Sequence, residues 1–180
     1  MSVLFKLKQK TFFLDGFVAI LLFFIVLFLY RSIVNVGFLS DDWHSLFIAA
    51  GEVPIWKFFA TNIIGTRVGS TYAPMWNTLF AGEFTLFNFW VPGYHIISIL
   101  LFSAGAFLLY LLTTHLFNDR LIGFIAGVLF LLLPSHVESI SWISVQLHLL
   151  SSLLYLSSLV AYERFAAKKF YRNYLLASLL

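Results

Sequence analysis

The feature that most constrains this chain is a set of long apolar runs that charged residues hardly interrupt. A helix needs roughly 20 apolar residues to cross the hydrocarbon core of a bilayer. The runs lie at about residues 13–34, 91–113, 121–133 and 136–162. Residues 174–180 are apolar again, which is typical of the start of a further span. The sequence therefore predicts an all-α, polytopic membrane protein with about four complete transmembrane helices and the start of a fifth.

Composition agrees with a chain whose surface faces lipid. Only 11% of the 180 residues are charged, whereas soluble domains have about 25%. The net charge of +3 is too small to indicate a nucleic-acid partner. The absence of cysteine excludes disulfides and thiolate metal sites within the chain. We expect residues 1–180 to be a single membrane domain, the N-terminal part of a larger transmembrane domain.

The first apolar run has a secretory signal peptide as its alternative interpretation. It follows a basic segment, as the apolar region of a signal does, but it is too long for that region. No cleavage site with small residues follows it. We therefore expect an uncleaved anchor helix.

The placement of Lys and Arg predicts the orientation in the membrane. Cytoplasmic loops are enriched in these residues. If the spans alternate, eight of the eleven fall on one side, namely Lys6, Lys8, Lys10, Arg120, Arg164, Lys168, Lys169 and Arg172. Only Arg31, Lys57 and Arg67 fall on the other. We expect an integral protein of the cytoplasmic (plasma) membrane with a cytoplasmic N terminus and residues 35–90 as a long outer loop.

The outer loop is rich in aromatic residues, which favour the headgroup level of a bilayer. Short helices lying on the membrane are expected around residues 55–62 and 74–84. The loop also begins with an acidic pair, Asp41 and Asp42. Adjacent carboxylates at this position suit a general base that takes a proton from a hydroxyl, or a divalent cation site for Mg or Mn. The alternative is a helix start with Ser40 as N-cap and both acids in the first turn.

A third acid, Glu138, follows Pro134 at the start of the fourth run. Ser135 and Glu138 have the spacing of a capping box. On a continuous helix, however, polar side chains would line one arc of about 140°: Glu138, Ser141, Ser144, His148, Ser151, Ser152 and Tyr155. A polar stripe inside a membrane turns inward. It would either join helices through hydroxyl hydrogen bonds or line a polar cavity, and the sequence leaves both open.

The remaining polar residues give weaker signals. His95, His136 and His148 could be metal ligands or bases, but no ligand spacing connects them, and structural roles are the alternative for each. Arg67 and Lys57 are the loop cations that could meet a phosphate, with solvated side chains as the alternative. No phosphate-binding glycine loop or nucleophile elbow occurs.

Three segments together resemble the GT-C superfamily of membrane glycosyltransferases, and within it the relatives of the protein O-mannosyltransferases. The first is the acidic pair after the first span. The second is Tyr72-Ala-Pro-Met75 followed by an aromatic stretch and Gly93-Tyr-His95, and the third is Pro134, His136, Glu138, Trp142, Ile143 and Ser144. Two positions depart from the family pattern: Ala73 replaces an arginine, and Ser144-Val-Gln-Leu-His148 replaces a Gly-Arg-x-Asp element.

This resemblance implies transfer of a sugar from a polyprenyl-phosphate donor to a protein, lipid or glycan acceptor. It implies Asp41 as the base, Asp42 and Glu138 as metal or acceptor ligands, and Arg67 as a phosphate ligand. Further substrate-binding residues would be Tyr72, His95, His136, Trp142 and His148. The alternative function is a non-enzymatic membrane protein, such as a transporter part or an assembly scaffold, in which the acids are caps and the serines pack helices.

Two single-cysteine variants test the orientation, because the chain has no cysteine of its own. In intact cells, Asn62→Cys in the outer loop should react with a membrane-impermeant thiol reagent. Lys8→Cys should react only after the membrane has been permeabilised. Labelling at position 8 but not at position 62 in intact cells would overturn the predicted topology.

Overall fold

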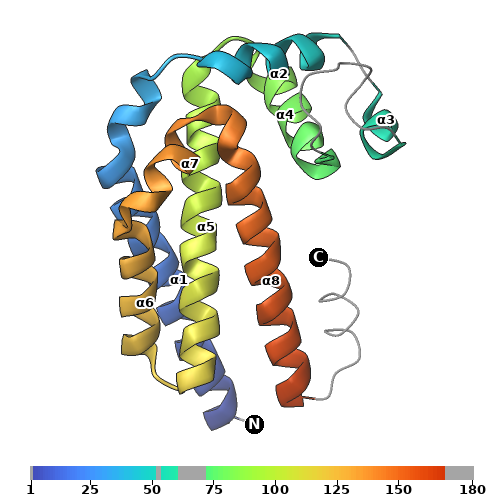
Figure 1. Ribbon diagram of the computed structural model, residues 1–180. Coiled ribbons are helices and arrows are strands. Elements are labelled where there is room, and N and C mark those ends of the chain that lie inside the picture. The colour runs from blue at the N-terminus through green and yellow to red at the C-terminus, as the bar shows by residue number, and fades with distance from the viewer. Residues whose placement is uncertain (1, 52–53, 61–71, 169–180) are drawn as a thin grey trace. The chain divides into compact units, whose positions relative to one another are not determined.

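The computed structural model describes residues 2–51, 54–60 and 72–168, and all the regular secondary structure in them is helical (Figure 1). Three segments are long and apolar enough to cross a membrane: Phe13–Asn35, Val91–Phe117 and Ile143–Ala166. A fourth span results only if Arg120–Leu132 and Pro134–Ser141, which are bent by 56° relative to each other, count as one. The all-α class is thus confirmed, with three candidate membrane-spanning helices, and the predicted count of four complete spans is not confirmed. The predicted start of a fifth, residues 174–180, lies outside the described residues.

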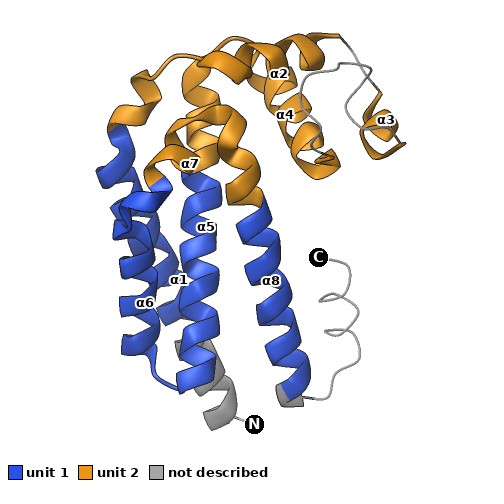
Figure 2. Cartoon of the chain, viewed as in Figure 1, with its two compact units in different colours: residues 1–31, 99–136, 151–180 blue, residues 32–98, 137–150 orange. Residues whose placement is uncertain are grey.

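The chain divides into two compact units (Figure 2). Unit 1 comprises residues 1–31, 99–136 and 151–180, and unit 2 comprises residues 32–98 and 137–150. The whole predicted outer loop, residues 35–90, falls in unit 2. The segment around Glu138 belongs to the same unit, although about fifty residues of sequence lie between it and the loop.

Unit 1 consists of helical segments, and α6 packs on α5 through small residues. It contains α1 (Ser2–Tyr30), most of α5 (Val91–Phe117), α6 (Arg120–Leu132), η3 (Pro134–His136) and most of α8 (Gln146–Lys168). A Cβ on Gly123 would collide with the Thr114 hydroxyl, and one on Gly127 would lie 3.3 Å from the Ala106 carbonyl oxygen. Glycines four residues apart let α6 approach the backbone of α5 closely, as in many membrane helix pairs.

Several polar side chains of unit 1 have hydrogen-bond or ion-pair partners. The Asp119 carboxylate caps α6 by accepting the Leu121 N–H at 2.7 Å. Asp15 accepts the Tyr110 hydroxyl at 2.7 Å and pairs with Arg120 at 3.4 Å. A carboxylate near a membrane is costly when it has no partner, which favours these contacts of Asp15. The contacts join α1, α5 and α6.

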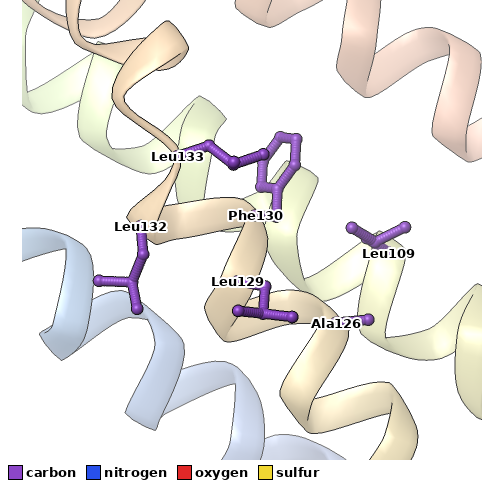
Figure 3. A pocket seen from close by; sticks show the side chains of 6 residues that line it. All are labelled: Leu109, Ala126, Leu129, Phe130, Leu132 and Leu133. Atoms are coloured by element: carbon purple, nitrogen blue, oxygen red, sulfur yellow. The ribbon is translucent and has the colours of Figure 1, made fainter.

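One side of α6 lines a cavity of about 540 Å³ (Figure 3). Its lining side chains, all apolar, are Leu109, Ala126, Leu129, Phe130, Leu132 and Leu133. A sugar site needs hydrogen-bonding groups to orient its ligand. The side chains that line this cavity offer no such group, so it does not fit a sugar site.

Unit 2 contains short helices around a small aromatic core. Its elements are α2 (Ser40–Ala50), α3 (Ile55–Ala60), α4 (Pro74–Phe87), the first residues of α5, α7 (Val137–Ser141) and η4 (Ile143–Val145), with most of η1 (Arg31–Asn35) before them. The core consists of Leu46, Phe80, Tyr94 and Ile143. Helices occur at both predicted positions of the loop, as α3 and α4, and α4 extends three residues further than expected. Residues 61–62 lie outside the described residues, and the position of these helices on a membrane stays a prediction.

The continuous helix predicted from residue 136 is wrong, because the chain breaks at Trp142. That residue is extended, with φ −105° and ψ 116°, and η4 separates α7 from α8. In a continuous helix the Ser144 N–H would bond to the carbonyl four residues earlier. Here it donates to the Asp42 carboxylate at 2.7 Å instead. The break places Glu138 and His148 on different helices, so the predicted single polar stripe does not form.

The close packing of α5 and α6 predicts opposite effects for two glycine substitutions. Gly123→Ala should destabilise the protein by about 1–3 kcal/mol, because the added methyl group meets Thr114 and the Tyr110 carbonyl oxygen. Gly16→Ala is the matched control, since no atom lies within 4 Å of its added Cβ and alanine favours helices by roughly 0.5–1 kcal/mol. Thermal unfolding in detergent measures both. Equal melting temperatures for the two variants would contradict the packing.

Candidate functional site in the second unit

Asp42, in the first turn of α2, is completely buried, and both of its carboxylate oxygens accept hydrogen bonds. Oδ2 accepts the Leu39 N–H at 2.8 Å. Oδ1 accepts the Ser144 N–H at 2.7 Å and the Ser144 hydroxyl at 2.5 Å. Charge-assisted hydrogen bonds of this kind are about twice as strong as neutral ones. The carboxylate thus joins the start of α2 to η4 across 102 residues of sequence.

Asp41 has the opposite environment, although it is the adjacent residue. Successive residues on a helix point about 100° apart, so the two carboxylates cannot share one face. Asp42 points to the core side together with Leu46, while Asp41 is exposed. Its only side-chain hydrogen bond among the described residues comes from the Ser40 hydroxyl at 3.3 Å. Asp41 is therefore the member of the pair that remains accessible to a substrate.

The capping interpretation of the acidic pair is correct in part. The N-cap is Leu39 rather than the predicted Ser40, and the third residue after it, Asp42, accepts the Leu39 N–H. Ser40 has φ +24°, which is uncommon for a residue with a side chain. Strained backbone of this kind persists only where the surroundings hold it, and it clusters at functional sites. Here the Asp42 carboxylate holds Leu39, the residue before Ser40, through the Leu39 N–H.

Hydrogen bonds also attach the neighbouring segments to the start of α5. The buried His95 donates its Nε2–H to the Val36 carbonyl at 2.9 Å, which fixes the chain just before α2. The Gln146 amide donates to the Tyr94 carbonyl and to the Ser98 hydroxyl, each at 2.9 Å. His95, which was predicted to bind substrate, therefore uses its Nε2 to position the segment before α2.

Glu138 is exposed on α7, and His148 is exposed on α8. Both were expected to turn inward, and the break at Trp142 removes the helix face on which that expectation depended. Among the described residues, no group of three acidic, histidine or cysteine side chains could hold a metal ion. Asp42 does not fit a metal ligand, because donors occupy both of its oxygens. A site shared by Asp41, Asp42 and Glu138 stays a prediction.

The other predicted substrate-binding residues are dispersed. Tyr72 is exposed and donates its hydroxyl to the Phe59 carbonyl at 2.8 Å. Trp142, at the helix break, has a buried Nε1 without a hydrogen-bond partner in the described chain. His136 belongs to unit 1, where its ring packs on Phe130 with centroids 4.5 Å apart. Arg67 lies outside the described residues.

Three residues of this region were not predicted as site residues: Ser144, Gln146 and Glu83. Glu83 lies on α4 with only 2% of its surface exposed. The sequence holds a signal for it, because Trp76, Phe80, Glu83, Phe84 and Phe87 fall within an arc of about 100° on one helix. An acid within an apolar stripe indicates a buried carboxyl. The partnership of Asp42 with Ser144 has no comparable signal in the sequence.

The chain is similar to a protein O-mannosyl-transferase of Caenorhabditis elegans. The two are 25% identical over an alignment of 146 positions, and the match covers 75% of this chain and 21% of that protein. The chain thus spans about a fifth of that relative's length. No family model matches the chain, and no solved structure matches it. The similarity supports a glycosyltransferase-like relationship.

A double-mutant cycle tests the bond between Asp42 and Ser144. Ser144→Ala should destabilise the protein by about 1.5–3 kcal/mol, the usual range for a hydrogen bond to a charged group. Combination with Asp42→Asn should give a coupling energy of roughly 0.5–3 kcal/mol in unfolding measurements. Ser141→Ala is the matched control, because its hydroxyl bonds only to the Val137 carbonyl of the same helix. If Ser144→Ala costs no more than Ser141→Ala, the bond is not important for stability.

Proposed function

We propose that this protein is a membrane glycosyltransferase that moves a sugar from a polyprenyl-phosphate-linked donor to an acceptor hydroxyl on the extracytoplasmic side of the plasma membrane. The observation that carries the proposal is the exposed carboxylate of Asp41 beside a buried, fully hydrogen-bonded Asp42. The similarity to a protein O-mannosyl-transferase supports the same reaction class. The acceptor class is a protein, lipid or glycan hydroxyl.

In the proposed reaction the Asp41 carboxylate is the general base. It accepts the proton of the acceptor hydroxyl as the hydroxyl oxygen attacks the anomeric carbon of the sugar. The bond between that carbon and the phosphate oxygen breaks, and its electron pair leaves with the polyprenyl phosphate. Attack opposite the leaving group inverts the configuration at the anomeric carbon. The role of Asp42 is to hold Asp41 at the start of α2.

The negative charge of the leaving phosphate has to be stabilised. Arg67 is the residue we propose for this role, and Glu138 is proposed to bind the acceptor. A divalent cation such as Mg or Mn would supply Lewis-acid stabilisation of the phosphate if bound. Asp42 is not suited to bind such an ion, because both of its oxygens already accept hydrogen bonds. The steps above therefore use only side chains of the protein.

Asp41→Asn in the full-length protein should lower transfer by about 10²- to 10⁴-fold, because asparagine cannot accept the proton. The melting temperature should stay close to that of the wild type, since Asp41 is exposed and makes one long side-chain hydrogen bond. The measurement is the turnover of a labelled polyprenyl-phosphate sugar.

Asp119→Asn is the control for that substitution. It also replaces a carboxylate by an amide, but in unit 1, where asparagine still caps α6. Its activity should match that of the wild type. Full transfer activity in Asp41→Asn would eliminate Asp41 as the base and favour the non-enzymatic interpretation, in which the acidic pair only organises a helix start.

A further inference from the structure

Glu83 is a buried carboxyl group without a compensating charge. Its side chain is 2% exposed, and neither of its oxygens has a hydrogen-bond partner in the described chain. No cation among the described residues pairs with it. An ionised carboxylate in such a place is very costly, because it loses its hydration and gains nothing in exchange.

The Gln146 side-chain amide lies against this carboxyl group. Both amide hydrogens are already donated, one to the Tyr94 carbonyl and one to the Ser98 hydroxyl. The Tyr94 carbonyl can only accept, so the amide cannot be turned around without placing two acceptors together. Gln146 Oε1 is therefore fixed as a buried acceptor, and it too has no donor.

The two Glu83 oxygens and Gln146 Oε1 are thus three buried acceptors without a donor among the described residues. A single proton on the carboxyl group resolves this conflict, because a protonated carboxyl donates one hydrogen bond. We propose that Glu83 is a neutral carboxylic acid whose O–H donates to Gln146 Oε1, and that it is a positioning residue for the acidic pair on α2. Burial also raises the pKa of Glu83 from 4.5 to about 8, an effect that Gln146 only partly opposes.

The positioning role follows from the packing of unit 2 and rests on the proposed function of Asp41. The proposed hydrogen bond joins Glu83 on α4 to Gln146, the first residue of α8. Phe80 of α4 packs in the same core as Leu46 of α2, one turn after Asp42. If Glu83 loses its proton, the carboxylate has to reach water, and α4 has to move with it. Helix α2 then loses the surface on which it rests.

Other titratable groups lie on the elements packed around α4. None of them makes a hydrogen bond to the Glu83 carboxyl group. On α2, Asp41 is exposed, Asp42 is bonded to Leu39 and Ser144, and His44 has a buried Nε2 without a partner. Lys57 of α3 lies 5.9 Å from the Trp56 ring. At the start of α5 and α8, the groups are Tyr94, bonded to the Asn88 carbonyl, His95, bonded to the Val36 carbonyl, and His148, which is exposed.

The sign of the pH effect follows from linkage. An acid whose pKa is higher in the folded chain than in the unfolded chain binds its proton more tightly when folded. Glu83 therefore costs the protein stability as the pH rises from 4.5 to about 8, and its effect is constant above that range. Glu83→Gln has no titrating proton, and its amide can still donate to Gln146 Oε1.

The first arm of the test measures the melting temperature of the full-length protein in detergent across this pH range. The melting temperature of Glu83→Gln minus that of the wild type should increase between pH 4.5 and about 8 and then level off. Glu138→Gln, which removes an exposed carboxyl from the same unit, should follow the wild type. Infrared spectroscopy at neutral pH should show a protonated-acid carbonyl band that Glu83→Gln lacks. A pH-independent difference, or no such band, overturns the proposal.

The second arm measures transfer activity against pH. Wild-type activity should fall above about pH 8, and Glu83→Gln should retain activity there, whereas Glu83→Leu should lose it at all pH values. If Asp41→Asn has full activity but the first arm succeeds, the proposed function fails and the buried acid stands. If the first arm fails while Asp41→Asn is inactive, the inference about Glu83 fails alone.

Discussion

The buried carboxylate of Asp42 is the constraint on which the second unit depends. A charge with no exposed surface has to receive hydrogen bonds from several donors, and here it receives two N–H groups and one hydroxyl. Two of these donors come from Ser144, which can supply its N–H only because the chain leaves the helical conformation at Trp142. The helix break and the start of α2 are therefore consequences of the same contact.

That contact also gives two adjacent acids different environments. With Asp42 fixed inward, the helical rotation sends Asp41 outward, and the strained Ser40 lies between Asp41 and the N-cap. Removal of a partner from a buried charge is expensive, so an arrangement of this kind resists rearrangement. For the base that we propose, Asp41, a fixed angle on a short helix gives the orientation that proton transfer from a hydroxyl requires.

Much of the fold follows from local patterns that a sequence displays. The apolar runs locate the spans because length and lack of charge are sufficient for a helix in lipid, and the aromatic spacing in α4 marks its buried face. The break at Trp142 could not be predicted, since it depends on the bond between Ser144 and Asp42, which are 102 residues apart. The same holds for the close approach at Gly123 and for the inward direction of Asp42. The acidic pair itself was identified, but which member faces the core depends on where the helix begins, one residue earlier than the Ser40 cap implied.

The similarity to a protein O-mannosyl-transferase supports a glycosyltransferase-like relationship, and the exposed Asp41 is the base that we propose for such a reaction. The most direct test of this account uses purified full-length protein in lipid nanodiscs with a labelled polyprenyl-phosphate sugar and an acceptor that carries a free hydroxyl. The account predicts release of polyprenyl phosphate together with a glycosylated acceptor of inverted anomeric configuration. No release with any hydroxyl acceptor, or a product of retained configuration, would contradict it.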